Sequence, residues 1–292
     1  MKKYLLALLI ITFSTGVQSK DFNKTEEMIE TILSEESGSA VKQQTEQVDL
    51  QQADDTTTST ENETGTEEDA ASSRKNSMSG KDESIYKTAI RLYETGYYDH
   101  SLAKFNEIIS SYSDSKFLDN AHIWAGRIYI KKYKYDDAIK EFDSVRDTSG
   151  EYPASLFYKA EAYRYKGDKI SSIEFYQKYA SEYPGDPLAA YSILNAGKLY
   201  LGNKQGTESL EAAIRLIKNY PDSDTIDDAY YLIAKIYEKD PVLRDVESAR
   251  RYYRIFLKKA ANNEKYFSDS PLLPAVKRDM EQLEKTHFKM ER

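Results

Sequence analysis

The sequence predicts an all-α repeat protein, and three observations carry that prediction. An aromatic residue recurs at intervals of 34, 37 and 37 residues, as Tyr129, Tyr163, Tyr200 and Tyr237. A small residue stands three positions before each of these tyrosines, as Gly126, Ala160, Gly197 and Ala234. From Ile85 onward the chain also holds all but one of its 25 tyrosines. A period of this length indicates a stack of helix pairs in which each pair contacts its neighbours.

The first 19 residues differ from all that follows. They begin with Lys2 and Lys3, continue with an apolar run over 4–13, and end in small and polar residues at Ser19. The run is about half the length that a membrane-spanning helix needs. The segment therefore predicts a secretory signal peptide cleaved after Ser19, with an uncleaved N-terminal anchor as the alternative. Because no later stretch approaches about 18 consecutive apolar residues, we expect no transmembrane helix in the mature chain.

Residues 20–84 form a second class of sequence. This segment carries 17 acidic against 6 basic residues, no Tyr, no Trp and a single Phe. Such a chain cannot bury enough apolar surface to offset the entropy of ordering it, so we expect a disordered, acidic, low-complexity tether. It would act as a passive spacer, or it would fold back and compete for the binding face of the repeats. Within this segment, only residues 22–33 have the apolar spacing of a short amphipathic helix. Such a helix would bind a partner, or the segment would be the start of the mature chain with nothing bound to it.

Composition excludes several classes of function. With no cysteine there is no disulfide framework, thiolate metal site or cysteine nucleophile. Three separated histidines offer no metal-binding spacing. The net charge of −8 argues against a nucleic-acid binder. Phosphate-binding and hydrolase motifs are absent from the sequence, and the acidic pairs at 136–137 and 227–228 fall at helix starts. We therefore expect a protein that is not an enzyme and needs neither a cofactor nor a metal.

Each repeat should hold a second helix after the one that carries the tyrosine. Its sign is a small residue followed four positions later by an aromatic, which lets two helices approach closely and fills the gap beside them. The pairs are Ser101 and Phe105, Ala138 and Phe142, Ser172 and Tyr176, Ser209 and Ala213, and Ala249 and Tyr253, where Ala213 replaces an aromatic. Gly96 and Gly167 mark inner turns, and Pro184 and Pro221 end second helices.

This pattern resembles the tetratricopeptide repeat, which places small residues, aromatics and a late proline at these places. The resemblance implies a right-handed superhelix of about five helix-turn-helix units between residues 85 and 292. The units are 82–115, 119–152, 153–186, 190–223 and 227–263, the last with an insertion of about three residues between its helices. Residues 271–292 should form a capping helix, because an exposed apolar end of the stack would be insoluble.

The segments that connect one repeat to the next resemble those of a smaller group within the family. The segments YSDSKFLDNAHIWAGRIY at 112–129 and YPDSDTIDDAYYLIAKIY at 220–237 resemble those of bacterial envelope repeat proteins of the BamD and YbgF (Tol-Pal-associated) type. The resemblance implies a periplasmic scaffold, associated with the outer membrane, that binds another protein in outer-membrane assembly or envelope organisation. Two alternatives stay open. One is an accessory component of periplasmic solute transport, which a narrow pocket lined by Tyr and Arg would favour; the other is a secreted surface protein that contacts external partners.

Ligands of such a stack usually lie along its concave face, which the first helix of each unit lines. Transferring the groove positions of the family gives the candidate contacts Tyr86, Tyr93, Asn120, Ile123, Arg127, Lys131, Phe157, Arg164, Leu194, Lys198, Tyr231 and Lys235. Cations beside aromatics favour a carboxylate-bearing or acidic peptide as the partner. The alternative is that these cations are only the solvated face of amphipathic helices. Trp124 lies beside the expected core face and should be structural.

Overall fold

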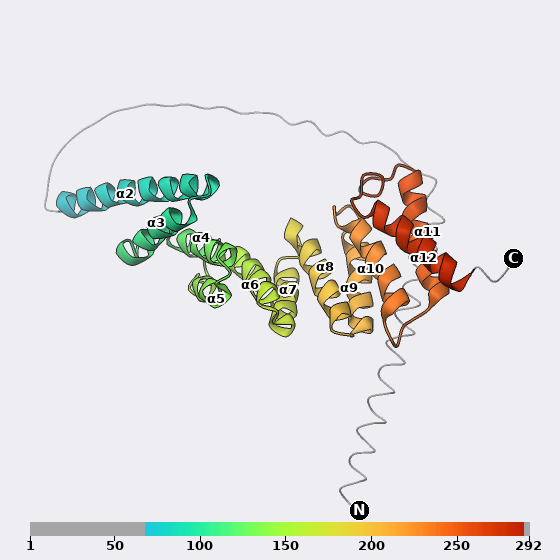
Figure 1. The fold of residues 1–292 in the computed structure, drawn as a ribbon. Coiled ribbons are helices and arrows are strands. Elements are labelled where there is room, and N and C mark those ends of the chain that lie inside the picture. The colour runs from blue at the N-terminus through green and yellow to red at the C-terminus, as the bar shows by residue number, and fades with distance from the viewer. Residues whose placement is uncertain (1–67, 289–292) are drawn as a thin grey trace, which may run out of the picture. The chain divides into compact units, whose positions relative to one another are not determined.

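The computed structural model describes residues 68–288, which hold eleven helices and no strand (Figure 1). The predicted all-α repeat class is therefore confirmed. The predicted signal peptide, most of the predicted tether and the last four residues of the predicted capping helix lie outside the described residues. The chain divides into two compact units on either side of the Glu151–Tyr152 bond. We call them the N-terminal unit (68–151) and the C-terminal unit (152–288) and describe each by itself.

The N-terminal unit consists of two helix pairs. They are α2 (Glu68–Glu94) with α3 (Tyr98–Ser111) and α4 (Leu118–Lys131) with α5 (Tyr135–Asp143). Each helix packs on the next, and fully buried side chains from the first three form the core, namely Ala89, Phe105, Ile108, Ala121, Ala125 and Ile128. These pairs overlap the first two predicted repeats, 82–115 and 119–152, and α2 starts 14 residues before the first.

The C-terminal unit holds three helix pairs and a last helix. The pairs are α6 (Tyr152–Lys166) with α7 (Lys169–Glu182), α8 (Pro187–Gly202) with α9 (Gly206–Asn219), and α10 (Ile226–Lys239) with α11 (Val246–Ala261). Figure 1 shows α8, α9, α10 and α11 side by side, each packed on the next. The last helix, α12 (Leu273–His287), packs on α11 through Val276, Met280 and Leu283, which are buried. No helix between residues 68 and 288 has the length and apolar character to cross a bilayer.

Helix α2 begins earlier than the sequence predicted. Residues 68–84 are helical, although composition assigned them to the disordered tether. The segment contains no proline that would stop a helix, but five of its 17 residues are serine and only seven are Glu, Ala, Arg or Lys, so helix propensity alone does not account for it. Its last part also belongs to the first repeat, since Asp82 is buried and accepts a hydrogen bond of 2.6 Å from the Ser115 hydroxyl. Residues 68–84 therefore belong to helix α2, and the predicted tether boundary at residue 84 is wrong.

A repeated side-chain bond explains why small residues recur in the units. The Ser101 hydroxyl donates to the Ala89 carbonyl, Ser172 to Ala160 and Ser209 to Gly197, at 2.8, 2.9 and 2.8 Å. In each case the serine on the second helix reaches the small residue of the first helix across a fully buried contact. Only small side chains bring the two backbones this close, so these pairs set the approach of the helices.

The inner turn of each regular repeat contains one residue in the left-handed backbone region. Gly96 and Gly167 have φ of 83° and 87°, and Tyr133 and Lys204 take φ of 60° and 61° at the equivalent place. Glycine adopts this conformation without a steric cost, whereas other residues are strained there. The inserted turn of the fifth repeat closes differently, because Asp240 is buried and accepts bonds of 2.9 Å from the amides of Val242 and Leu243.

Candidate functional site

The N-terminal unit gathers aromatic rings from its two first helices, α2 and α4. The Tyr93 ring meets the Trp124 ring edge to face, with centroids 4.8 Å apart. The Trp124 Nε1 donates a hydrogen bond of 3.1 Å to the Tyr86 hydroxyl. All three side chains are half-buried, so each keeps part of its surface open to solvent. Burial raises the pKa of the Tyr86 hydroxyl above its ordinary value.

Two cations lie on this aromatic group. The Arg127 guanidinium carbon is 4.0 Å from the Trp124 ring centroid and 5.5 Å from that of Tyr93. The Lys131 ammonium is 5.9 Å from the Tyr93 centroid and 5.5 Å from that of Tyr98. Cations at these distances are attracted to the negative face of an aromatic ring. We call the set Tyr86, Tyr93, Trp124, Arg127 and Lys131 the Trp124 face.

Lys131 is the exposed cation of the Trp124 face. Among residues 68–288, no acidic side chain forms an ion pair with it. Asn120, one turn earlier in α4 than Trp124, donates a hydrogen bond of 2.8 Å to Glu151. The face therefore offers one cation whose charge is not already neutralised by a carboxylate of the chain.

The predicted groove cations of the C-terminal unit have internal partners. Arg164 donates to Glu161 at 2.7 Å and Lys198 to Asp228 at 2.6 Å. Lys235 donates to Glu238 at 2.6 Å and to Asp279 of α12 at 3.0 Å. An external carboxylate would have to compete with these existing pairs.

The last of these pairs belongs to a network that joins α12 to the predicted groove positions of α10. The Tyr231 hydroxyl donates to the Asp279 carboxylate at 2.8 Å, beside the bond from Lys235. Burial opposes ionisation of Asp279, but the bonds from Tyr231 and Lys235 prevail and lower its pKa. Burial likewise opposes the charge on Lys235, whose pKa is nevertheless raised by Glu238 and Asp279. The network therefore stays charged and fastens α12 onto α10.

Three predicted contact residues are buried in the core. Ile123, Phe157 and Leu194 expose 4, 6 and 2 % of their surface. The Phe157 ring packs against the Tyr176 and Tyr179 rings of α7, with centroids 6.1 and 5.7 Å away. Because all three side chains are buried, the surface open to a ligand does not include them.

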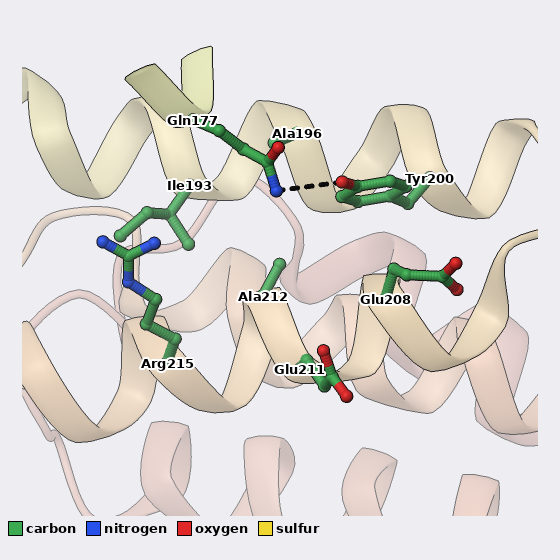
Figure 2. A pocket seen from close by; sticks show the side chains of 8 residues that line it. All are labelled: Gln177, Ile193, Ala196, Tyr200, Glu208, Glu211, Ala212 and Arg215. Atoms are coloured by element: carbon green, nitrogen blue, oxygen red, sulfur yellow. Dashed lines mark hydrogen bonds between the residues drawn. The ribbon is translucent and has the colours of Figure 1, made fainter. Parts of the chain in front are cut away.

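A pocket of about 160 Å³ lies in the C-terminal unit between α8 and α9 (Figure 2). Figure 2 shows the Tyr200 ring and Glu208 near one end and Ile193 and Arg215 near the other. The Gln177 amide of α7 donates a hydrogen bond of 2.9 Å to the Tyr200 hydroxyl. The complete lining is Gln177, Ile193, Ala196, Tyr200, Glu208, Glu211, Ala212 and Arg215.

Sequence reasoning missed part of the Trp124 face and all of the pocket between α8 and α9. It assigned Trp124 a structural role, and the indole does pack on the core beside Phe105. It did not show that the same ring also contacts Tyr86, Tyr93 and Arg127. It named none of the residues around the pocket as a site. The signal for the pocket was present, because the repeats before and after it carry Phe175 and Tyr252 at the position where α9 has Ala212.

Comparison with known proteins agrees with the repeat fold. A family model described as the tetratricopeptide repeat matches residues 154–186 and 191–223, the stretches that form α6–α7 and α8–α9. No match was found among curated proteins.

Solved structures of other proteins are similar in fold. A crystal structure of MamA protein is similar with a TM-score of 0.52 and 19% identity, over 64% of this chain and 96% of that one. Another crystal structure of MamA gives a TM-score of 0.50 and 17% identity, over 61% and 97%. TPR-like repeats from Podosopora anserina give 0.50 and 14%, over 63% and 96%. At these identities the likeness shows the fold alone.

Proposed function

We propose that this tetratricopeptide-repeat chain is a non-enzymatic scaffold that binds an extended, acidic or carboxylate-bearing peptide of another protein through the Trp124 face. Stacks of helix pairs bind such segments along the surface of their first helices. One observation carries the proposal: α2 and α4 bring four of the predicted contacts together around Trp124, namely Tyr86, Tyr93, Arg127 and Lys131.

The positive charge of the Trp124 face favours an acidic peptide as the partner. Lys131 is exposed and presents its ammonium beside aromatic rings, so a carboxylate can bind it without displacing an internal one. Lys198 and Lys235 already hold Asp228 and Asp279. The acidic end of a peptide should therefore depend on Lys131 far more than on Lys198.

Features of the sequence support a cellular setting for this scaffold. The signal-like residues 1–19 and the envelope-type linkers support a periplasmic scaffold in outer-membrane assembly or envelope organisation. A secreted surface protein that meets external partners shares the same signal and is the second possibility. A solute-transport accessory has some support, because Tyr200 and Arg215 line the pocket between α8 and α9. Its support is weaker, since the pocket of about 160 Å³ is smaller than the roughly 300–1,000 Å³ of small-molecule sites.

Affinity purification from the native cell envelope tests the proposal. The full chain would be tagged and compared with the R127E/K131E double variant, and K198E serves as the matched charge-reversal control. We expect one or more partners that the wild-type chain and K198E retain and that the double variant loses. If the same partners remain bound to the double variant, the Trp124 face is not the binding surface. Fractionation of the same cells shows whether the chain resides in the periplasm.

A further inference from the structure

Two repeats of the C-terminal unit cover their first-helix tyrosine with a ring from the second helix. In the α6–α7 pair, Tyr163 stacks on Phe175, with centroids 5.5 Å apart and planes inclined by 7°. In the α10–α11 pair, Tyr237 stacks on Tyr252 at 6.0 Å and 19°. Stacked rings at these spacings attract each other beyond the area they bury. This arrangement recurs although the rest of the two repeats differs in sequence.

The α8–α9 pair between them lacks that covering ring. Its first-helix tyrosine is Tyr200, and the residue equivalent to Phe175 and Tyr252 is Ala212. Helix α9 contains no aromatic residue that could take over the contact. Tyr200 and Ala212 both line the pocket of Figure 2. The pocket is therefore the space that an aromatic ring fills in the repeats before and after it.

We propose that this pocket binds an aromatic side chain of a partner protein, stacked on Tyr200. Its volume of about 160 Å³ suits a single ring, since an apolar cavity of about 150 Å³ holds benzene. Ile193, Ala196 and Ala212 supply apolar contacts for the ring edge. The Gln177 amide holds the Tyr200 hydroxyl, so the stacking surface is already oriented before a ligand arrives.

A ring belonging to a protein fits better than a free small molecule. A ligand as small as one ring has too few atoms for tight binding, because affinity per atom is bounded. A side chain avoids this limit, since the segment that carries it makes further contacts outside the pocket. Glu208, Glu211 and Arg215 at the rim provide polar groups of both signs for such a segment. Buried aromatic anchors with a polar surround are the usual arrangement at protein interfaces.

The pocket and the Trp124 face are separate sites. The pocket lies among α7, α8 and α9 of the C-terminal unit, and its lining includes none of the predicted groove residues. The inference rests on the proposed function only in taking the ligand to be part of a protein. If experiments refute binding at one of the two sites, the proposal for the other site still stands.

A pair of probes tests the pocket directly. N-acetyl-phenylalanine amide and N-acetyl-leucine amide would be titrated into the full chain and followed by NMR. We expect saturable binding of the phenylalanine amide, at least ten-fold tighter than that of the leucine amide. A212F should place the chain's own ring in the pocket, lower the affinity at least ten-fold and raise the melting temperature. Y200L keeps the pocket but removes the stacking ring, and this variant should no longer bind the phenylalanine amide more tightly than the leucine amide.

Equal binding of the two amides, or unchanged binding by both variants, would overturn the proposal. If A212F does not fold, the binding measured with Y200L still tests the proposal.

Selection from a random peptide library distinguishes a partner segment from a free aromatic molecule. Peptides would be selected on the wild-type chain and tested against A212F and K131E. We expect peptides with an aromatic residue at one fixed position that bind A212F at least ten-fold more weakly and K131E equally well. Peptides that depend on Lys131 alone would support the Trp124 face and refute the pocket as a peptide site. If the amide binds and no peptide depends on Ala212, the occupant is a small aromatic molecule and the proposal is wrong.

Discussion

Gly126 of α4 offers the sharpest test of how the repeats pack. A Cβ atom added at this position would lie 2.4 Å from Cε1 and 2.6 Å from Cζ of the Phe142 ring. Phe142 is 2 % exposed, so its ring has little room to move. Overpacking a core costs about 1–3 kcal/mol, against a gain of about 1 kcal/mol when alanine replaces glycine in a helix. Contacts of 2.4 and 2.6 Å are far shorter than any normal carbon–carbon contact, so the overpacking cost should be about 2–3 kcal/mol. We therefore expect G126A to destabilise the N-terminal unit by a net amount of about 1–2 kcal/mol, or roughly 4–16 °C in melting temperature.

Gly80 provides the matched control, because it is also helical but has no atom within 4 Å of an added Cβ. G80A should therefore stabilise the unit by up to about 1 kcal/mol. Trp124 is the one tryptophan of the chain and lies in this unit, so its fluorescence during thermal unfolding reports both changes. The F142L substitution should relieve part of the loss in G126A. If G126A raises the melting temperature as G80A does, close packing of Phe142 on Gly126 does not set the spacing of α4 and α5.

Three further predictions follow from particular contacts. K204G should raise the stability of the C-terminal unit by about 1 kcal/mol in urea unfolding, because Lys204 has a φ of 61°, whereas K204A should give no gain. S209A should cost about 1–2 kcal/mol by removing the buried bond to the Gly197 carbonyl, and S181A, which removes an exposed one, should change stability by less than about 0.5 kcal/mol. Burial raises the pKa of Tyr176 and Tyr253 above 10.0, and their hydroxyls donate to Glu161 and Glu238. The stability that this contributes is present below pH 10 and should be lost as the pH rises further, so urea midpoints should fall from pH 9 to pH 11, and the Y176F/Y253F variant should show a smaller fall.

The repeat architecture was accessible from sequence because its determinants are local and periodic. The spacing of Tyr163, Tyr200 and Tyr237 and the small residues before them mark first helices, and serines such as Ser172 and Ser209 mark second helices. The error at 68–84 has a clear origin. Low apolar content shows that a segment cannot form a core of its own, but it does not prevent helix α2, which is held in the first repeat through Ala89, from extending backwards over 68–84.

The candidate site was only partly accessible, because ligand contacts depend on neighbours far away in sequence. The groove positions identified Arg127 and Lys131 correctly as side chains that lie together on one face. They did not show that Asp228 and Asp279 neutralise Lys198 and Lys235, since these partners lie 30 and 44 residues away. The pocket beside Tyr200 arises from a side chain that is missing, which only comparison between repeats makes visible.

The central claim is that the Trp124 face binds acidic peptides, and Trp124 itself can report it. The full chain would be titrated with an oligoglutamate peptide and, separately, with an oligolysine peptide of equal length, while the tryptophan emission is recorded. We predict a saturable change with oligoglutamate that weakens with added salt, persists in K198E and is lost in K131E, and no such change with oligolysine. An equal response to the two peptides, or an oligoglutamate response that survives K131E, would contradict the claim.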